Sequence, residues 1–403
     1  MSYNQTVQQF LNQLQLAWRR RDANLVSGFF SLKDPHIVNN NLYHFNPDNA
    51  DMYVETTVVD VIAPHLRCIA CLKDKNFTEA YNNQLAVMQA FVKIFQNLKN
   101  DNWLIPVIYT VCLDLRMLTY NVNSELTQSQ LKTGVVKPRE ALENTAEAIM
   151  GAFRVCAADN RSGEQETKRW GMMLFANQLF KVYFKMSQLH LMKPLIRAID
   201  SSPFKSKFSI SQQVTYKYYA GLKAMMDEDY KSANQYLTFA FERCEKSSKR
   251  NKQHILIYLI PIRILLGYMP TREVLEKYDL LPMWDIANAV KRGRVNELVQ
   301  VMSTYQALLC KYRIYTVVEK LRMITYRNMF KKVFLLHKNP LIDMNVLMVT
   351  LQIFEDPEID LDETHCILAN LIHEGKVKGY ISLSHQKLVL SKIDPFPKLT
   401  SIG

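Results

Sequence analysis

Most of the chain carries hydrophobic residues at helical spacing, in segments of about 12–20 residues separated by short polar breaks. Only 11 of the 403 residues are glycine. The chain therefore lacks the turn residues that a β-sandwich, a barrel or a glycine-loop nucleotide fold would need. Because 48% of the residues are hydrophobic, a full core can be buried. The pattern predicts an all-α protein of many helices joined by short connections.

Two pairs of predicted helices resemble repeats: residues 65–72 with 77–98, and residues 216–226 with 230–244. Neither pair can bury its apolar face alone, so we expect them to stack into a TPR-like helical-repeat array, although their spacing matches no named class. We expect an N-terminal repeat region over 1–205 and the helical part of a C-terminal domain over 206–310, with the joint at residues 201–207. The Asn-rich residues 39–49 and the polar residues 121–138 are expected to be loops.

Residues 311–403 have a different pattern. Predicted helices over 313–336, 344–354 and 361–374 precede the one convincing strand signal of the sequence, residues 377–383 and 387–391 around a short turn. Asp360 is placed to cap the third helix, with Glu363 completing a capping box, and Gly375 is placed to end that helix. Three helices followed by a small β-hairpin predict a C-terminal winged helix.

Positive charge points to a polyanionic partner. There are 50 Lys and Arg against 38 Asp and Glu, a formal net charge of +12. If 313–336 were one unbroken helix, Arg313, Lys320, Arg327, Lys331 and Lys338 would share a stripe able to follow a phosphate backbone. The candidate nucleic-acid-binding residues are Lys320, Arg327, Lys331, Lys332, Lys338, Lys376, Lys378, Lys387 and Lys392. A secondary basic cluster comprises Lys246, Lys249, Arg250 and Lys252.

The third helix of the winged helix has no Lys or Arg between Asp360 and Glu374, so base reading in a DNA major groove is not expected. Binding should be weakly selective and sensitive to salt. Tyr326, Phe330 and Tyr380 could stack on bases, but aromatic residues at helical spacing are more often core. The opposing interpretation of the basic residues is a solvated helix face on which some of them pair with acidic residues elsewhere. Arg322 and Arg327 lie inside the apolar stretch, so each is also a candidate for a structural ion pair.

Other functions find little support in the sequence. Seven Cys without a periodic framework indicate reduced thiols and an intracellular protein. Cys68 and Cys71, with His65 nearby, have no second Cys/His pair to complete a zinc site, so we expect core thiols. We find no secretory signal, no membrane-length apolar run and no nucleotide-loop, HExxH or GxSxG motif. A soluble non-enzyme without cofactor or metal is expected.

Several segments carry a family resemblance. Residues 366–390 (CILANLIHEGKVKGYISLSHQKLVL) resemble the end of a PCI domain, a module shared by the proteasome lid, the signalosome and a translation initiation factor. Five further blocks resemble the PCI subunits of the nuclear transcription and export complex 2: residues 64–68 (PHLRC), 193–202 (KPLIRAIDSS), 214–225 (VTYKYYAGLKAM), 255–270 (ILIYLIPIRILLGYMP) and 319–336 (EKLRMITYRNMFKKVFLL).

This resemblance implies a helical array joined to a winged helix and a non-enzymatic role in mRNA export. The implied location is the nucleus, including nuclear pores, with some protein in the cytoplasm. The implied partners are a GANP-type export scaffold, a small acidic subunit shared with the proteasome lid, and RNA or single-stranded DNA. The alternative is a purely architectural PCI subunit of a lid-like assembly, in which winged helices pack side by side and the basic charge faces acidic protein. Membrane binding is not expected.

Overall fold

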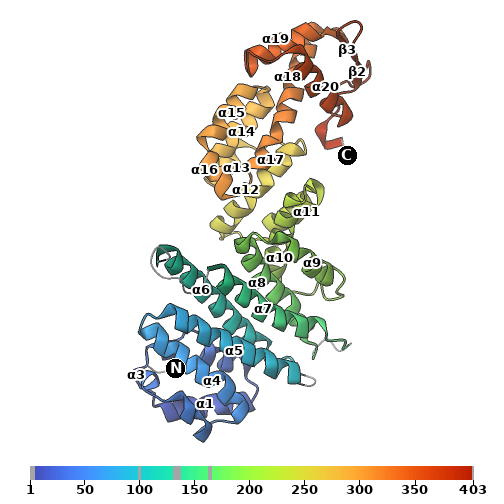
Figure 1. Ribbon diagram of the computed structural model, residues 1–403. Coiled ribbons are helices and arrows are strands. Elements are labelled where there is room, and N and C mark those ends of the chain that lie inside the picture. Colours follow the sequence, from blue (N-terminus) through green and yellow to red (C-terminus); the bar gives the residue numbers. More distant parts are fainter. Residues whose placement is uncertain (1–4, 99–100, 130–137, 162–165, 402–403) are drawn as a thin grey trace. The chain divides into compact units, whose positions relative to one another are not determined.

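The computed structural model describes residues 5–98, 101–129, 138–161 and 166–401 (Figure 1). The chain divides into two compact units, Met1–Tyr219 and Ala220–Gly403. The division falls inside one helix, beyond the joint expected at residues 201–207. The three-part division into 1–205, 206–310 and 311–403 stays a prediction. Within the described residues, no helix combines the length and the apolar character needed to cross a bilayer.

The first unit is built from antiparallel helices around one hydrophobic core. Its helices are α1 (Val7–Arg19), α2 (Ala23–Phe30), α3 (Asn40–Tyr43), α4 (Thr56–Lys73), α5 (Phe77–Asn97), α6 (Ile105–Ser129), α7 (Pro138–Ala157), α8 (Gly171–Met186), α9 (Met192–Asp200) and the first part of α10 (Ile210–Met226). Short 3-10 turns lie between them: η1 (Pro35–Val38), η2 (Pro47–Met52), η3 (Lys168–Trp170) and η4 (Leu189–Leu191). The predicted helix pair 65–72 and 77–98 corresponds to α4 and α5.

Two expected loops in this unit are partly helical. Residues 121–129 continue α6, so the expectation of a loop there is wrong; residues 130–137 lie outside the described part. Val122, 1% exposed, packs into the core at the start of this polar stretch, and tertiary packing of this kind supplies most of the stability of a helix. The Asn-rich stretch contains α3 and the start of η2, with Asn39 capping α3 by accepting a hydrogen bond from the Asn41 amide.

The second unit begins with a pair of helices that approach each other closely, at the predicted pair of residues 216–226 and 230–244. α10 meets α11 (Tyr230–Arg243) at Gly221, where an added Cβ would lie 2.7 Å from Cγ of Leu237. Next come α12 (Lys249–Leu265), α13 (Arg272–Lys277), α14 (Leu281–Arg292), α15 (Val295–Thr304), α16 (Gln306–Lys311) and α17 (Tyr315–Glu319). Ala220 of α10 and Ala233 and Ala240 of α11 are buried as well.

The winged helix closes the second unit (orange to red in Figure 1). It comprises α18 (Leu321–His337), β1 (Leu341–Asp343), α19 (Met344–Phe354), α20 (Leu361–His373), β2 (Gly379–Ser382), β3 (Lys387–Leu390) and a final turn, η5 (Leu399–Ser401). The three strands form an antiparallel sheet in the order β1-β3-β2. The predicted three helices and hairpin are present, as are the Asp360 cap and the left-handed Gly375, whereas β1 was not predicted.

Candidate nucleic-acid interface

The winged-helix sheet has one buried and one exposed face. Strand alternation turns Ile342 and Leu388 inward, where they are at most 1% exposed and join the core of the winged helix. The opposite face carries Tyr380, which is 62% exposed, and Lys387. Lys378 is exposed just before β2, beside Ser391, which donates its backbone N–H to the Lys378 carbonyl. This face therefore combines an aromatic ring with cationic side chains.

The predicted basic stripe does not form. Arg313 adopts a left-handed conformation (φ 57°) before α17, Lys320 separates α17 from α18, and Lys338 is again left-handed (φ 56°) at the end of α18. A projection at about 100° per residue applies only to a continuous helix. The expectation of one helix over 313–336 is therefore wrong, and the five basic residues are not aligned.

Arg327 is not a surface residue. It is 5% exposed, and its Nη2 donates to the backbone oxygens of Phe396 (3.0 Å) and Pro397 (2.6 Å), while its Nη1 donates to Oδ1 of Asn328 (2.9 Å). Burial lowers the pKa of Arg327, an effect that Asp394 partly opposes. The expectation that Arg327 presents its charge to solvent is wrong, because the side chain holds the returning C-terminal segment against α18.

Three more of the predicted cationic side chains form ion pairs or hydrogen bonds within the protein. Lys320 pairs with Glu228 at 2.5 Å, Lys376 pairs with Glu374, and Lys332 donates to the backbone oxygen of Arg292 at 2.7 Å. The remaining five, Lys331, Lys338, Lys378, Lys387 and Lys392, have no side-chain hydrogen bond or ion pair with any residue that the structure describes. All five are exposed except Lys331, which is partly buried. Lys387 lies opposite Asp343 in the sheet.

The secondary basic cluster is dispersed. Lys252 is 8% exposed and donates to the backbone oxygen of Phe241 at 3.0 Å, with its ammonium over the Phe241 ring. Lys249 pairs with Asp279 at 2.8 Å. Only Lys246 and Arg250 remain exposed without such a partner among the described residues. The expectation that all four side chains share one cationic surface is wrong, because Lys252 serves packing.

Of the three aromatic candidates, only Tyr380 is accessible. Phe330 is fully buried, and Tyr326 is 6% exposed, with its hydroxyl donating to Glu355 at 2.5 Å. Burial and the Glu355 carboxylate raise the pKa of Tyr326. Arg322 pairs with the same carboxylate at 2.6 Å, which confirms its expected role as a structural ion-pair partner.

Two basic residues outside the main candidate sets lie beside predicted ones; the sequence marks Lys291, in a basic turn with Arg292 and Arg294, only as a weaker candidate, and it does not mark Lys398. Lys291 at the end of α14 and Lys398 before η5 line a cleft of about 520 Å³ together with Lys331 and Lys332 of α18. No local sequence pattern could have indicated that these lysines share a cleft, because they come from three separate segments.

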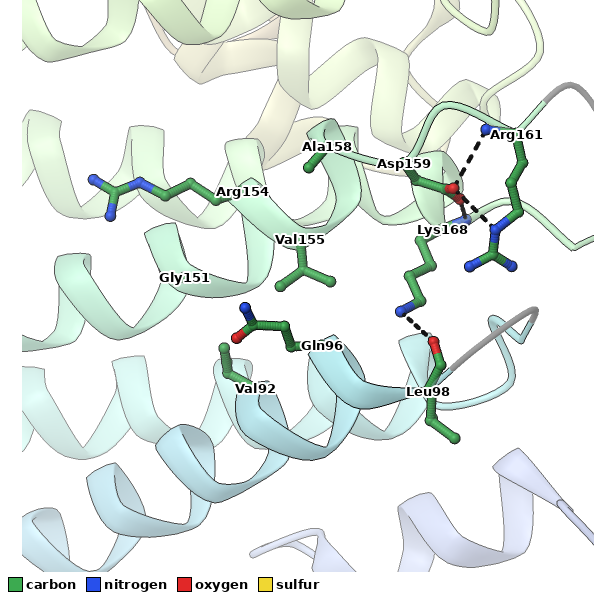
Figure 2. A pocket seen from close by; sticks show the side chains of 10 residues that line it. All are labelled: Val92, Gln96, Leu98, Gly151, Arg154, Val155, Ala158, Asp159, Arg161 and Lys168. Atoms are coloured by element: carbon green, nitrogen blue, oxygen red, sulfur yellow. Dashed lines mark hydrogen bonds and ion pairs between the residues drawn. The ribbon is translucent and has the colours of Figure 1, made fainter.

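A pocket of about 700 Å³ in the first unit contains a structural polar network (Figure 2). Asp159 accepts hydrogen bonds from the Thr167 hydroxyl (3.0 Å) and the Lys168 amide (2.6 Å) and pairs with Arg161 at 3.1 Å. Nζ of Lys168 donates to the backbone oxygen of Leu98 at 2.8 Å. These hydrogen bonds join the loop that carries Asp159 and Lys168 to the end of α5, so the network has a structural role.

The cysteine pair has a packing role. Cys68 is fully buried against Ala80 and Leu118, and burial raises the pKa of its thiol. Nε2 of His65 faces Nε2 of His36 at 3.2 Å, so its ring does not turn toward the thiols. Among the described residues, no three His, Cys, Asp or Glu side chains gather in a way that could hold a metal ion.

Comparison with known proteins matches this architecture. Residues 302–392 match the model of the PCI domain family. The chain is 44% identical over 398 residues to PCI domain-containing protein 2 of Xenopus laevis, covering 98% of this chain and 99% of that protein. The corresponding homolog of Drosophila melanogaster is 43% identical over a similar span. The Schizosaccharomyces pombe protein named CSN12 homolog is 32% identical over 356 residues.

Proposed function

The chain belongs to the PCI domain-containing protein 2 family, and from that premise we propose that it is a non-enzymatic scaffold subunit of a nuclear mRNA export complex that also contacts nucleic acid. Proteins with PCI domains are generally scaffold subunits of multi-subunit complexes. The proposed partners are a GANP-type export scaffold and a small acidic subunit shared with the proteasome lid. The proposed location is the nucleus, including nuclear pores, with some protein in the cytoplasm.

The observation that carries the nucleic-acid part is the exposed face of the sheet. Tyr380 offers a ring on which a base can stack, and Lys378 and Lys387 provide charges free to meet phosphates. These contacts use the base face and the backbone, so they favour single strands with little sequence preference. The charged residues in the first turn of α20, Asp362 and Glu363, are both acidic, which favours binding without base reading in a major groove.

A binding experiment tests this face. We expect the full chain to bind a labelled single-stranded RNA. Changing Lys378 and Lys387 of this face, together with exposed Lys392 two residues beyond β3, to Gln should lower the slope of log affinity against log salt by about 2, at about 0.7 per lost contact. Tyr380→Leu should weaken binding by roughly 5- to 150-fold, from about 1–3 kcal/mol per stacked base.

The control removes equal charge elsewhere. Lys93, Lys185 and Lys193 are exposed on helices of the first unit and have no side-chain partner among the described residues. Changing these three to Gln should leave the salt slope near that of the unmodified chain. If both triple variants weaken binding equally, net charge rather than this face is responsible, and the proposed interface is refuted.

A second candidate function is a purely architectural subunit of a lid-like assembly. It is favoured by exposed apolar side chains on the outer face of α19, where Val346 is 42%, Val349 46% and Ile353 65% exposed. Apolar groups gathered on one face are typical of protein interfaces. Recovery of proteasome-lid subunits without an export scaffold, in a pull-down from nuclear extract, together with no RNA crosslinks on residues 311–403, would favour this function over the first.

A further inference from the structure

The cleft lined by Lys291 and Lys398 contains none of the residues of the exposed face of the sheet, and four segments of the second unit form it. These are the end of α14, the middle of α18, residues 267–269 after α12, and residues 398–400 at the C-terminal turn. Gly267 has a φ of 90°, and a Cβ there would lie 2.6 Å from Cβ of Leu399. The final turn η5 is thus packed closely on the segment after α12, and it forms one side of the cleft.

The lining is strongly cationic. Lys291, Lys331, Lys332 and Lys398 all line the cleft, and none of the described lining residues is acidic. Among these four lysines, Lys332 alone has a side-chain partner within the described part of the chain, the Arg292 carbonyl. Like charges around one cavity repel one another, and a bound anion relieves this electrostatic repulsion.

The lining also includes Arg327, a buried charge on which Asp394 acts electrostatically without forming an ion pair. Arg327 has its Nε buried without a hydrogen-bond partner. Its three hydrogen bonds go to neutral oxygens, two from backbone and one from an amide, and no carboxylate of the described residues lies within ion-pair distance. A desolvated guanidinium is stabilised chiefly by a nearby anion, so the cleft is prepared for negative charge.

Shape and apolar lining narrow the choice of anion. A volume of about 520 Å³ suits a ligand of one or two nucleotides, since small-ligand pockets span about 300–1,000 Å³. Leu335, 57% exposed, and Met269, 36% exposed, offer apolar contact for a sugar or a base. A rigid duplex holds its phosphates on a convex surface, whereas a flexible single strand can bend into a cleft.

We propose that this cleft is a phosphate-binding subsite for single-stranded nucleic acid, in which Lys291, Lys331 and Lys398 contact the backbone and Arg327 supplies buried positive potential. The inference rests on the proposed nucleic-acid function and adds to it a second point of contact, separate from the exposed face of the sheet. A strand held at both places would be anchored by charge in the cleft and by stacking at Tyr380.

The test uses the full chain with Lys291, Lys331 and Lys398 changed to Gln. Lys332 stays because its hydrogen bond supports the fold. Affinity for a labelled 12-nucleotide single-stranded RNA is measured by fluorescence anisotropy across a salt series. Three lost single-strand contacts should lower the salt slope by about 2 and the affinity at 0.15 M salt by up to about fifty-fold. The triple variant of Lys93, Lys185 and Lys193 is the charge-matched control.

The outcomes separate the inference from the function on which it rests. If the unmodified chain does not bind RNA, the nucleic-acid function itself fails. If it binds and the cleft variant matches the control triple variant, the subsite is refuted while the exposed face of the sheet stands. A competing duplex should displace the labelled strand less well than an unlabelled single strand; equal competition would also overturn the proposal. Lys398→Glu alone, on the C-terminal turn, provides a second variant should the triple change disturb folding.

Discussion

Arg327 provides a sharp test of how the C-terminal segment is held. Arg327→Met keeps most of the side-chain volume and keeps water out, but it removes every donor. The carbonyls of Phe396 and Pro397 then lose their partner in a buried site. Each buried acceptor left without a donor lowers the free energy of unfolding by about 1–3 kcal/mol. The variant no longer buries a charged guanidinium, and this gain offsets part of that loss. We expect a net loss of about 3 kcal/mol.

For a unit of this size, each kcal/mol lowers the melting temperature by about 2–4 °C. Calorimetry of the full chain should therefore show the transition of the second unit shifted down by about 6–12 °C, with faster hydrogen exchange at the amides of residues 398–401. Lys331→Met, on the same helix, is the matched control, because Lys331 has no side-chain partner among the described residues; it should change stability by at most about 0.5 kcal/mol. An unchanged transition and unchanged exchange in Arg327→Met would refute the reasoning.

Two further perturbations follow from the packing. Gly293→Ala should destabilise the second unit by more than about 1–2 kcal/mol, because φ is 65° and an added Cβ would lie 2.5 Å from a backbone nitrogen of α18; thermal denaturation with an unchanged midpoint would contradict this. Burial lowers the pKa of His36 to about 4 and that of His65 below its usual value. The unfolded chain therefore binds protons first as pH falls, so the first unit should lose stability between about pH 6.5 and 4. A variant with both histidines changed to Leu should lose less over that range, and equal losses would count against the buried pair.

Local patterns predicted the winged helix well. The apolar spacing located α19 at its observed bounds, and Asp360 and Gly375 marked the ends of α20 because capping depends on a few neighbouring residues. The strand β1 was not predicted. It has only three residues, too few to show alternation, and its pairing with β3 joins segments far apart in the sequence.

The candidate site was predicted less well, for two physical reasons. A helical projection assumes a straight axis, and the left-handed conformations of Arg313 and Lys338 cannot be read from side-chain pattern. Ion pairing depends on distant residues: Glu228, which neutralises Lys320, lies in an earlier helix connection. Lys378, Lys387 and Lys392 are exposed, as expected for the hairpin, because strand alternation and turn position are local, whereas Lys376 pairs with Glu374.

The packing of the winged helix sets the limits of any fragment that could fold alone. The family match spans residues 302–392, yet the hydrophobic core of this module includes Val295 before that span and Phe396 after it. A polypeptide cut at the family boundaries would lose core side chains at both ends and leave Arg327 without its carbonyl acceptors. Soluble expression of the isolated module therefore requires a longer piece, from before α14 through η5.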